Sequence, residues 1–130
     1  MSYTIRWGGP GDVEDVAIAF AGVVSVEELI AAFSELRASP RFRTSMRMLH
    51  DHRLTDWSAT TSSDIRRRAE AVARFEDPNE RHRVAVVVDE KLPYGLMRMR
   101  QAYSEEHLAS VDGVFYDLES ARAWLSEAEP

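Results

Sequence analysis

The stretch that decides the fold covers residues 84–103, Val-Ala-Val-Val-Val-Asp-Glu-Lys-Leu-Pro-Tyr-Gly-Leu-Met-Arg-Met-Arg-Gln-Ala-Tyr. Its first five residues, Val84 to Val88, are apolar and mostly β-branched, which is typical of a strand buried on both faces. Pro93 lacks an N–H and cannot extend the ladder, so a turn follows. From Gly95 onward, apolar residues recur with the period of a helix. This pattern predicts the central strand–turn–helix unit of an α/β sheet, and such turns commonly form one wall of a ligand crevice.

Length and composition limit the classes of protein that fit. The 130 residues make one domain of ordinary size. A net charge of -6 argues against a nucleic-acid binder and against docking on anionic membrane surfaces. Cysteine is absent, which excludes disulfides, thiolate catalysis and Cys-based metal sites. No apolar run has the length of a membrane span or marks a signal peptide, so we expect a cytoplasmic protein without membrane insertion.

The N-terminal region predicts an antiparallel hairpin. Tyr3, Ile5 and Trp7 alternate with polar residues, as in a half-buried strand. The cluster Gly8–Asp12 combines glycines and a proline, which is typical of a turn. A second strand is expected at Asp15–Phe20, and the short connection makes the two strands antiparallel neighbours.

The rest of the chain alternates helices with strands. Ser25 and Glu28 form a capping-box motif that starts a helix reaching about Arg37. The later elements are expected in this order: a strand at Met46–Asp51, a polar loop at His52–Thr61, a helix starting within Thr61–Asp64, the strand Val84–Val88, a helix from Gly95, a strand at Gly113–Tyr116, and a helix capped by Asp117. This order predicts a single α/β domain with a mostly parallel five-stranded sheet, an antiparallel N-terminal hairpin at its edge, and four helices.

The order of elements and several short motifs resemble the STAS superfamily, in its SpoIIAA-like branch. The residues that carry the resemblance are Gly22–Leu29, Met48–Arg53, Tyr94–Met99 and the end of the chain from Val114 to Leu125. The resemblance covers most of the chain and implies a SpoIIAA-like fold, related to that of the CRAL-TRIO lipid-binding domains. Proteins of this kind are small, cytoplasmic and bacterial. The better-studied relatives are phosphorylated switches whose phosphoacceptor serine follows an aspartate at a helix start, where this chain has Ser62, Ser63 and Asp64.

Candidate catalytic and metal-binding residues each have a simpler explanation. His50 and His52 flank Asp51 and could share a strand face as metal ligands, but no third histidine lies nearby in the sequence, and ordinary polar residues at a strand end explain them much better. Asp51, Asp56 and Asp89 could supply a carboxylate pair for acid–base chemistry. No serine has the Gly-x-Ser-x-Gly setting of a nucleophile, and aspartates at strand ends usually hydrogen-bond the backbone. We therefore expect no metal, no cofactor and no enzymatic activity.

The strongest candidate for a site is a crevice at the carboxyl ends of the parallel strands. The turns after Asp51 and Val88 should open on the same edge of the sheet. The residues expected to bind a ligand there are Asp51, Arg53, Trp57, Tyr94, Gly95 and Arg98. Free N–H groups at the Gly95 helix start and the Arg98 guanidinium favour an anionic group, while Trp57 and Tyr94 can cover an apolar part.

These observations predict a non-enzymatic module of STAS/SpoIIAA-like type that binds a small ligand or has a regulatory role. A phosphorylation-controlled protein-interaction switch at Ser62 or Ser63 is the alternative. A small hydrolase or isomerase is a third hypothesis. The partners that stay open are a small anionic or lipid-like ligand, a protein and a second copy of the chain.

Overall fold

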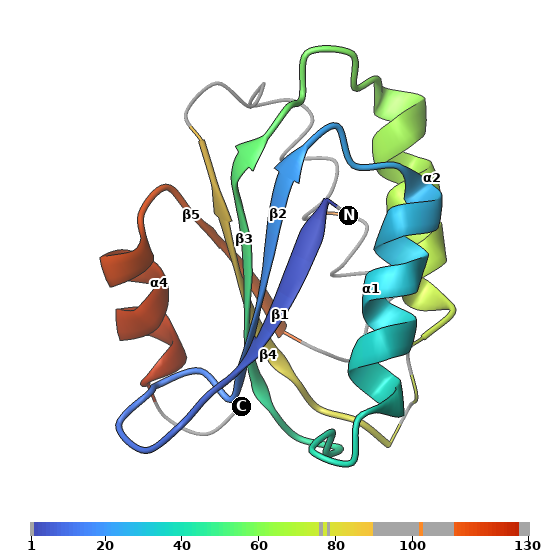
Figure 1. Cartoon of the computed structure of the whole chain (residues 1–130). Helices are drawn as coiled ribbons and strands as arrows, with labels where there is room; N and C mark the ends of the chain where they lie inside the picture. Colours follow the sequence, from blue (N-terminus) through green and yellow to red (C-terminus); the bar gives the residue numbers. More distant parts are fainter. Residues whose placement is uncertain (1, 76, 78, 90–101, 103–110, 128–130) are drawn as a thin grey trace.

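The described residues form a five-stranded sheet covered by helices on both faces (Figure 1). The computed structural model describes residues 2–75, 77, 79–89, 102 and 111–127. Its elements are β1 (Tyr3–Trp7), β2 (Val16–Gly22), α1 (Val26–Ala38), β3 (Arg47–Thr55), α2 (Ser62–Ala73), β4 (Arg83–Val88), β5 (Val111–Phe115) and α4 (Leu118–Leu125). The strands lie in chain order, β1 pairs with β2 antiparallel, and the other pairs are parallel. The α/β architecture and the antiparallel N-terminal hairpin are confirmed.

One prediction about the arrangement needs correction, and another is tested only in part. The described residues form three helices where four were predicted, and the helix expected from Gly95 lies outside the described residues. The strand at Val84–Val88 is buried as predicted, with an exposed fraction of 7% or less at each residue. It is not the central strand, however, because β4 lies between β3 and β5 and the middle of the sheet is β3. Strand order depends on long-range pairing, which the local apolar pattern does not contain.

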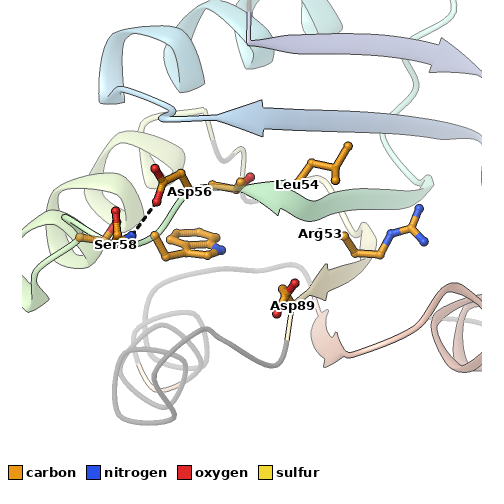
Figure 2. A pocket seen from close by; sticks show the side chains of 8 residues that line it. Arg53, Leu54, Asp56, Ser58 and Asp89 are labelled. Atoms are coloured by element: carbon orange, nitrogen blue, oxygen red, sulfur yellow. Dashed lines mark hydrogen bonds between the residues drawn. The ribbon is translucent and has the colours of Figure 1, made fainter.

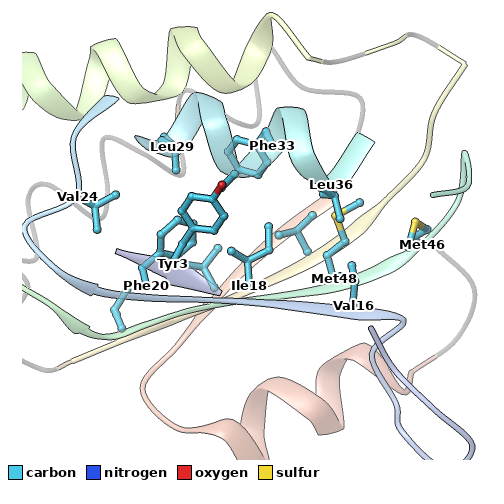
Figure 3. Packing of buried hydrophobic residues seen from close by; sticks show 14 residues of the cluster. Tyr3, Val16, Ile18, Phe20, Val24, Leu29, Phe33, Leu36, Met46 and Met48 are labelled. Atoms are coloured by element: carbon cyan, nitrogen blue, oxygen red, sulfur yellow. The ribbon is translucent and has the colours of Figure 1, made fainter. Parts of the chain in front are cut away.

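The larger core lies between the sheet and helices α1 and α2 (Figure 3). In β2, alternate residues Val16, Ile18 and Phe20 face this core, because successive side chains of a strand point to opposite faces of the sheet. They meet Phe33 and Leu36 of α1, and all five side chains have an exposed fraction of 8% or less. Burying such side chains stabilises the fold by about 1.5–3 kcal/mol each relative to leaving them in water.

Helix α1 begins where the capping-box motif placed it. The Ser25 hydroxyl accepts from the Glu28 backbone N–H at 3.1 Å, and the Glu28 carboxylate accepts from the Ser25 N–H at 3.4 Å. Helix α2 begins with a second capping box, formed by Thr61 and Asp64. These contacts satisfy N–H groups that have no partner inside the helix.

A smaller core lies on the opposite face, under α4. It joins Ala121 and Leu125 of α4 to Leu49, Ala85 and Val87 of the sheet. Helix α4 contacts β4 and β5, so it covers only one side of this face. Figure 1 shows α4 alone on this face among the described helices, with α1 and α2 on the other.

Strand β3 is longer than predicted, which changes where the candidate residues lie. It continues to Thr55, whereas the sequence pattern placed a polar loop from His52 onward. The reason is that His50, His52 and Thr55 face the larger core and are buried despite being polar. Between the pairs Ala19–Asp51 and Ala21–Leu54, β3 contains one more residue than β2, which is a β-bulge.

Candidate functional site

A cavity lies at the carboxyl end of the parallel strands (Figure 2). Its volume is about 570 Å³. The described residues that line it come from the end of β3, the turn that follows, and the residue after β4: Arg53, Leu54, Thr55, Asp56, Trp57, Ser58, Thr60 and Asp89. The cavity exists because β3 extends beyond β4, whose last residue, Val88, is level with His52. This edge of an α/β sheet is where ligands commonly bind.

Two of the predicted site residues line this cavity, while a third, Asp51, hydrogen-bonds one of them without lining the cavity. Arg53 and Trp57 both line it. Asp51 does not, because it lies inside β3 and faces the side of the sheet covered by α4, where it lines a second cleft. Tyr94, Gly95 and Arg98 lie outside the described residues.

Asp51 orients the guanidinium of Arg53. Arg53 donates to Asp51 through Nε at 3.0 Å and through Nη2 at 2.8 Å, and its backbone N–H donates at 3.0 Å. Burial acts to raise the pKa of Asp51, but the hydrogen bonds from Arg53 outweigh it and hold the pKa below its ordinary value. The charged pair therefore persists at neutral pH. Such a two-point contact fixes the plane of the guanidinium.

Trp57 forms the apolar wall of the cavity. Its ring lies 5.3 Å from His52 and 5.5 Å from the Arg68 guanidinium of α2, measured to the ring centroid. The indole Nε1 is buried and has no hydrogen-bond partner in the part of the chain that the structure describes. Burial lowers the pKa of Arg68, and its Nη2 donates to the Val24 carbonyl. These contacts hold the indole between the sheet and α2.

The sequence reasoning missed the pair formed by His52 and Thr55. His52 Nδ1 lies 3.0 Å from the Thr55 hydroxyl, and its ring stacks on Phe20 with centroids 4.4 Å apart. The signal was the spacing of His50 and His52, which matches that of strand residues on one face, together with the β-branched Thr55. The pair packs among aromatic rings and supports the cavity wall from beneath.

The charges on the described lining are mixed. Arg53 supplies one cation, while Asp56 and Asp89 supply two carboxylates. The hydrogen bonds from Ser58, including a backbone N–H at 2.9 Å, hold the pKa of Asp56 below its ordinary value. A ligand with several negative charges would face repulsion from both carboxylates. Among the described residues, no three His, Asp or Glu side chains are grouped as a metal site would require.

Ser62 and Ser63 are the first two residues of α2, and both are exposed. The capping residue of this helix is Thr61, so neither serine hydroxyl forms the N-cap. In the sequence, they closely follow the turn that carries Trp57 and Ser58, and Thr60 is the lining residue of the cavity that lies nearest to them along the chain.

The sheet order, the antiparallel first hairpin and the helices on two faces define a SpoIIAA-like fold. The structure is similar to that of an uncharacterized protein from the DUF3478 family with a SpoIIAA-like fold, from Shewanella loihica PV-4. The TM-score is 0.61, the sequences are 16% identical, and the match covers 95% of this chain and 94% of the other. The fold implied by the sequence resemblance is therefore confirmed, and the likeness extends to the fold alone.

No protein-family model matches the sequence, and no curated protein matches it. The longest helix among the described residues, α1, has 13 residues, and no described helix is long and apolar enough to cross a membrane.

Proposed function

We propose that the protein is a non-enzymatic module that binds a small ligand in the cavity at the carboxyl ends of β3 and β4. The observation that carries this proposal is the cavity of about 570 Å³. Ligand pockets typically measure about 300–1,000 Å³ and combine apolar walls with a few fixed polar groups. Trp57 and Leu54 supply the apolar part here, and Arg53 supplies an oriented cation. The SpoIIAA-like fold supports a binding or regulatory module.

The lining also narrows the class of ligand. Leu54 has an exposed fraction of 76%, so its contact with an apolar group would remove a large apolar surface from water. One anionic group can approach Arg53, whereas Asp56 and Asp89 favour hydrogen-bond donors. We therefore propose a small ligand with an apolar part and a single negative charge, such as an aromatic monocarboxylate. Nucleotides and other polyanions fit less well.

Leu54→Asp should weaken binding at this cavity by roughly tenfold or more, because a third carboxylate would then oppose the ligand's charge. Phenylacetate and indole acetate are suitable probes, titrated while the amide signals of the protein are followed by NMR. We expect shifts at Leu54, Thr55 and Trp57.

Val23→Asp is the matched control, because Val23 is also exposed, at 67%, but does not line the cavity. It should leave the affinity unchanged. Shifts confined to other surfaces, or equal effects of the two variants, would contradict the proposed site. Turnover by the wild-type protein against a panel of esters and phosphate esters would contradict the non-enzymatic role and favour a hydrolase.

A phosphorylation-controlled switch is the second candidate, favoured by the exposed hydroxyls of Ser62 and Ser63 at the start of α2. A phosphate there would be stabilised by the helix dipole and would change the surface without disturbing the core. In protein taken from its native cells, a phosphate-dependent shift in gel migration should be present in wild type and absent from Ser62→Ala/Ser63→Ala. The exposed Ser58 provides the control, since Ser58→Ala should keep the shift. A wild-type protein without any shift would rule out this candidate.

A further inference from the structure

A second cleft lies on the opposite side of the sheet from α1, beside α4. Its volume is about 260 Å³. Its floor consists of Ala17 and Ala19 of β2, and Leu49 of β3 borders it. Neither Trp57 nor any other aromatic residue is among its described lining, so it is separate from the cavity proposed above.

The cleft follows from the sequence of β2, in which alanines alternate with larger residues. Val16, Ile18 and Phe20 face the larger core, so Ala17, Ala19 and Ala21 face the other side. In the register, Ala19 lies between Thr4 of β1 and Asp51 of β3, and Ala17 lies between Arg6 and Leu49. Because an alanine is shorter than its neighbours on both sides, the row leaves a groove along β2. Ala19 and Ala21 are exposed, which keeps the groove open along its length.

Two arginines stand at the α4 end of this groove. Arg6 of β1 and Arg122 of α4 both line it, and both bind the carboxylate of Glu14. Arg6 Nη2 lies 2.9 Å from Glu14 Oε1, and Arg122 Nη2 lies 3.1 Å from the same atom. Glu14 is fully buried at its side chain, whereas the two arginine side chains remain 52% and 42% exposed. Glu14 therefore fixes both guanidiniums from below and leaves their outer sides open to solvent.

The two guanidiniums at this end are already paired with acidic side chains, and the donor group that stays available to a ligand is on Arg122. One buried carboxylate is shared by two guanidiniums, and the charge of Asp51 is matched by Arg53. Asp12 forms a further ion pair with Arg6, at 3.4 Å at the exposed rim, and after the hydrogen bonds to Glu14 its charge helps to raise the pKa of Arg122. Arg122 uses Nε and Nη2 for Glu14, and within the described residues no acceptor is recorded for its Nη1. A preorganised cation of this kind binds carboxylates at low entropic cost.

We propose that this groove binds a free aliphatic monocarboxylate, with the carboxylate on Nη1 of Arg122 and the alkyl chain over Ala17 and Ala19. The volume is just below the range of about 300–1,000 Å³ that drug-sized ligands occupy, so the chain is short or of medium length. The alanine floor offers contact area without hydrogen-bonding groups, which selects an alkyl chain over a polar one. This site is independent of the proposed function, because it uses different residues on a different face of the sheet.

Octanoate is the probe that tests this proposal, with octanol as a probe that lacks the charge and inorganic phosphate as one that lacks the alkyl chain. In an NMR titration, octanoate should shift the signals of Thr4, Ala17 and Ala19. It should bind at least roughly tenfold more tightly than octanol or phosphate, because each of these lacks one of the two contacts. Octanol binding as tightly as octanoate would overturn the proposal, and so would octanoate shifts confined to the Trp57 cavity.

Ala19→Leu should fill the groove and weaken octanoate binding by at least roughly tenfold. Ala19 is exposed in a strand, so a larger apolar residue there is tolerated by the fold. Ala31→Leu, at an exposed position of α1, makes the same change away from the groove and should leave octanoate binding unchanged. Equal affinities in the two variants would overturn the site. Binding of phenylacetate at Trp57 should persist in Ala19→Leu, so failure of one site does not imply failure of the other.

Discussion

Val86→Asp should abolish the folded state or lower its free energy of unfolding by about 4 kcal/mol or more. Val86 has an exposed fraction of 2% and lies between His50 of β3 and Val114 of β5. An aspartate there would bury a charge without a counter-ion, which costs far more than the lost valine contacts. Chemical denaturation, monitored by circular dichroism, measures the free energy of unfolding. The spread of the amide chemical shifts in an NMR spectrum shows whether any folded protein remains.

Val111→Asp makes the same substitution on the neighbouring strand. Val111 begins β5, at the edge of the sheet, and has an exposed fraction of 48%. Its carboxylate would stay in water, so we expect a loss of about 1 kcal/mol or less. Similar losses in the two variants would show that β4 is not buried between its neighbours.

Glu80→Ala should lower the free energy of unfolding by about 3 kcal/mol, because it removes the acceptor of a buried network. The Glu80 side chain is 4% exposed and receives Nη1 of Arg37 at 2.9 Å, while His82 Nε2 lies 2.8 Å away. Denaturation at neutral pH measures the loss. Glu127→Ala removes another carboxylate paired with an arginine, Arg83, but that carboxylate is 65% exposed. Its loss should cost at most about 0.5 kcal/mol, since exposed pairs contribute little.

The same network gives an expected pH dependence. The hydrogen bonds from Arg37 are the largest cause that holds the pKa of Glu80 below its ordinary value of 4.5, and burial opposes them. A carboxyl whose pKa is lower in the folded state stabilises the fold fully above pH 4.5 and loses that contribution as the pH falls through the folded pKa. Glu80→Gln cannot titrate, so its stability should fall less steeply below pH 4.5 than that of wild type. Parallel curves would contradict the assignment.

The parts of the fold that depend on local chemistry could be predicted from the sequence. The apolar run Val84–Val88 and the Ser25 capping box both lie where their patterns placed them. The end of β3 could not be predicted, because His52 is polar yet buried against Phe20. The strand order could not be predicted either, since pairing is decided between residues far apart in the chain.

The candidate site was predicted in part. Arg53 and Trp57 were expected at the carboxyl edge, and both line the cavity there. Asp51 was expected beside them and does hydrogen-bond Arg53, but it faces the α4 side of the sheet, because strand residues alternate and its neighbours His50 and His52 face the larger core. Leu54 could not be predicted as a lining residue, because a single apolar residue in a polar stretch carries no periodic signal. The groove over β2 was also missed. Alternating alanines are compatible with a strand, but they do not indicate which residues of the neighbouring strands lie on either side of them.

The order of the strands has a consequence for how this chain can fold as it is synthesised. Every strand after β1 in the described part of the chain pairs with the strand before it in the sequence, so each of these strands finds an existing edge to join. No strand has to enter later between two that are already paired, and each pairing closes only the loop between consecutive strands. We therefore expect the sheet to grow in one direction, from β1 to β5, as the polypeptide leaves the ribosome. Until β5 arrives, the buried strand β4 is the growing edge, and its valines are then the surface most exposed to aggregation.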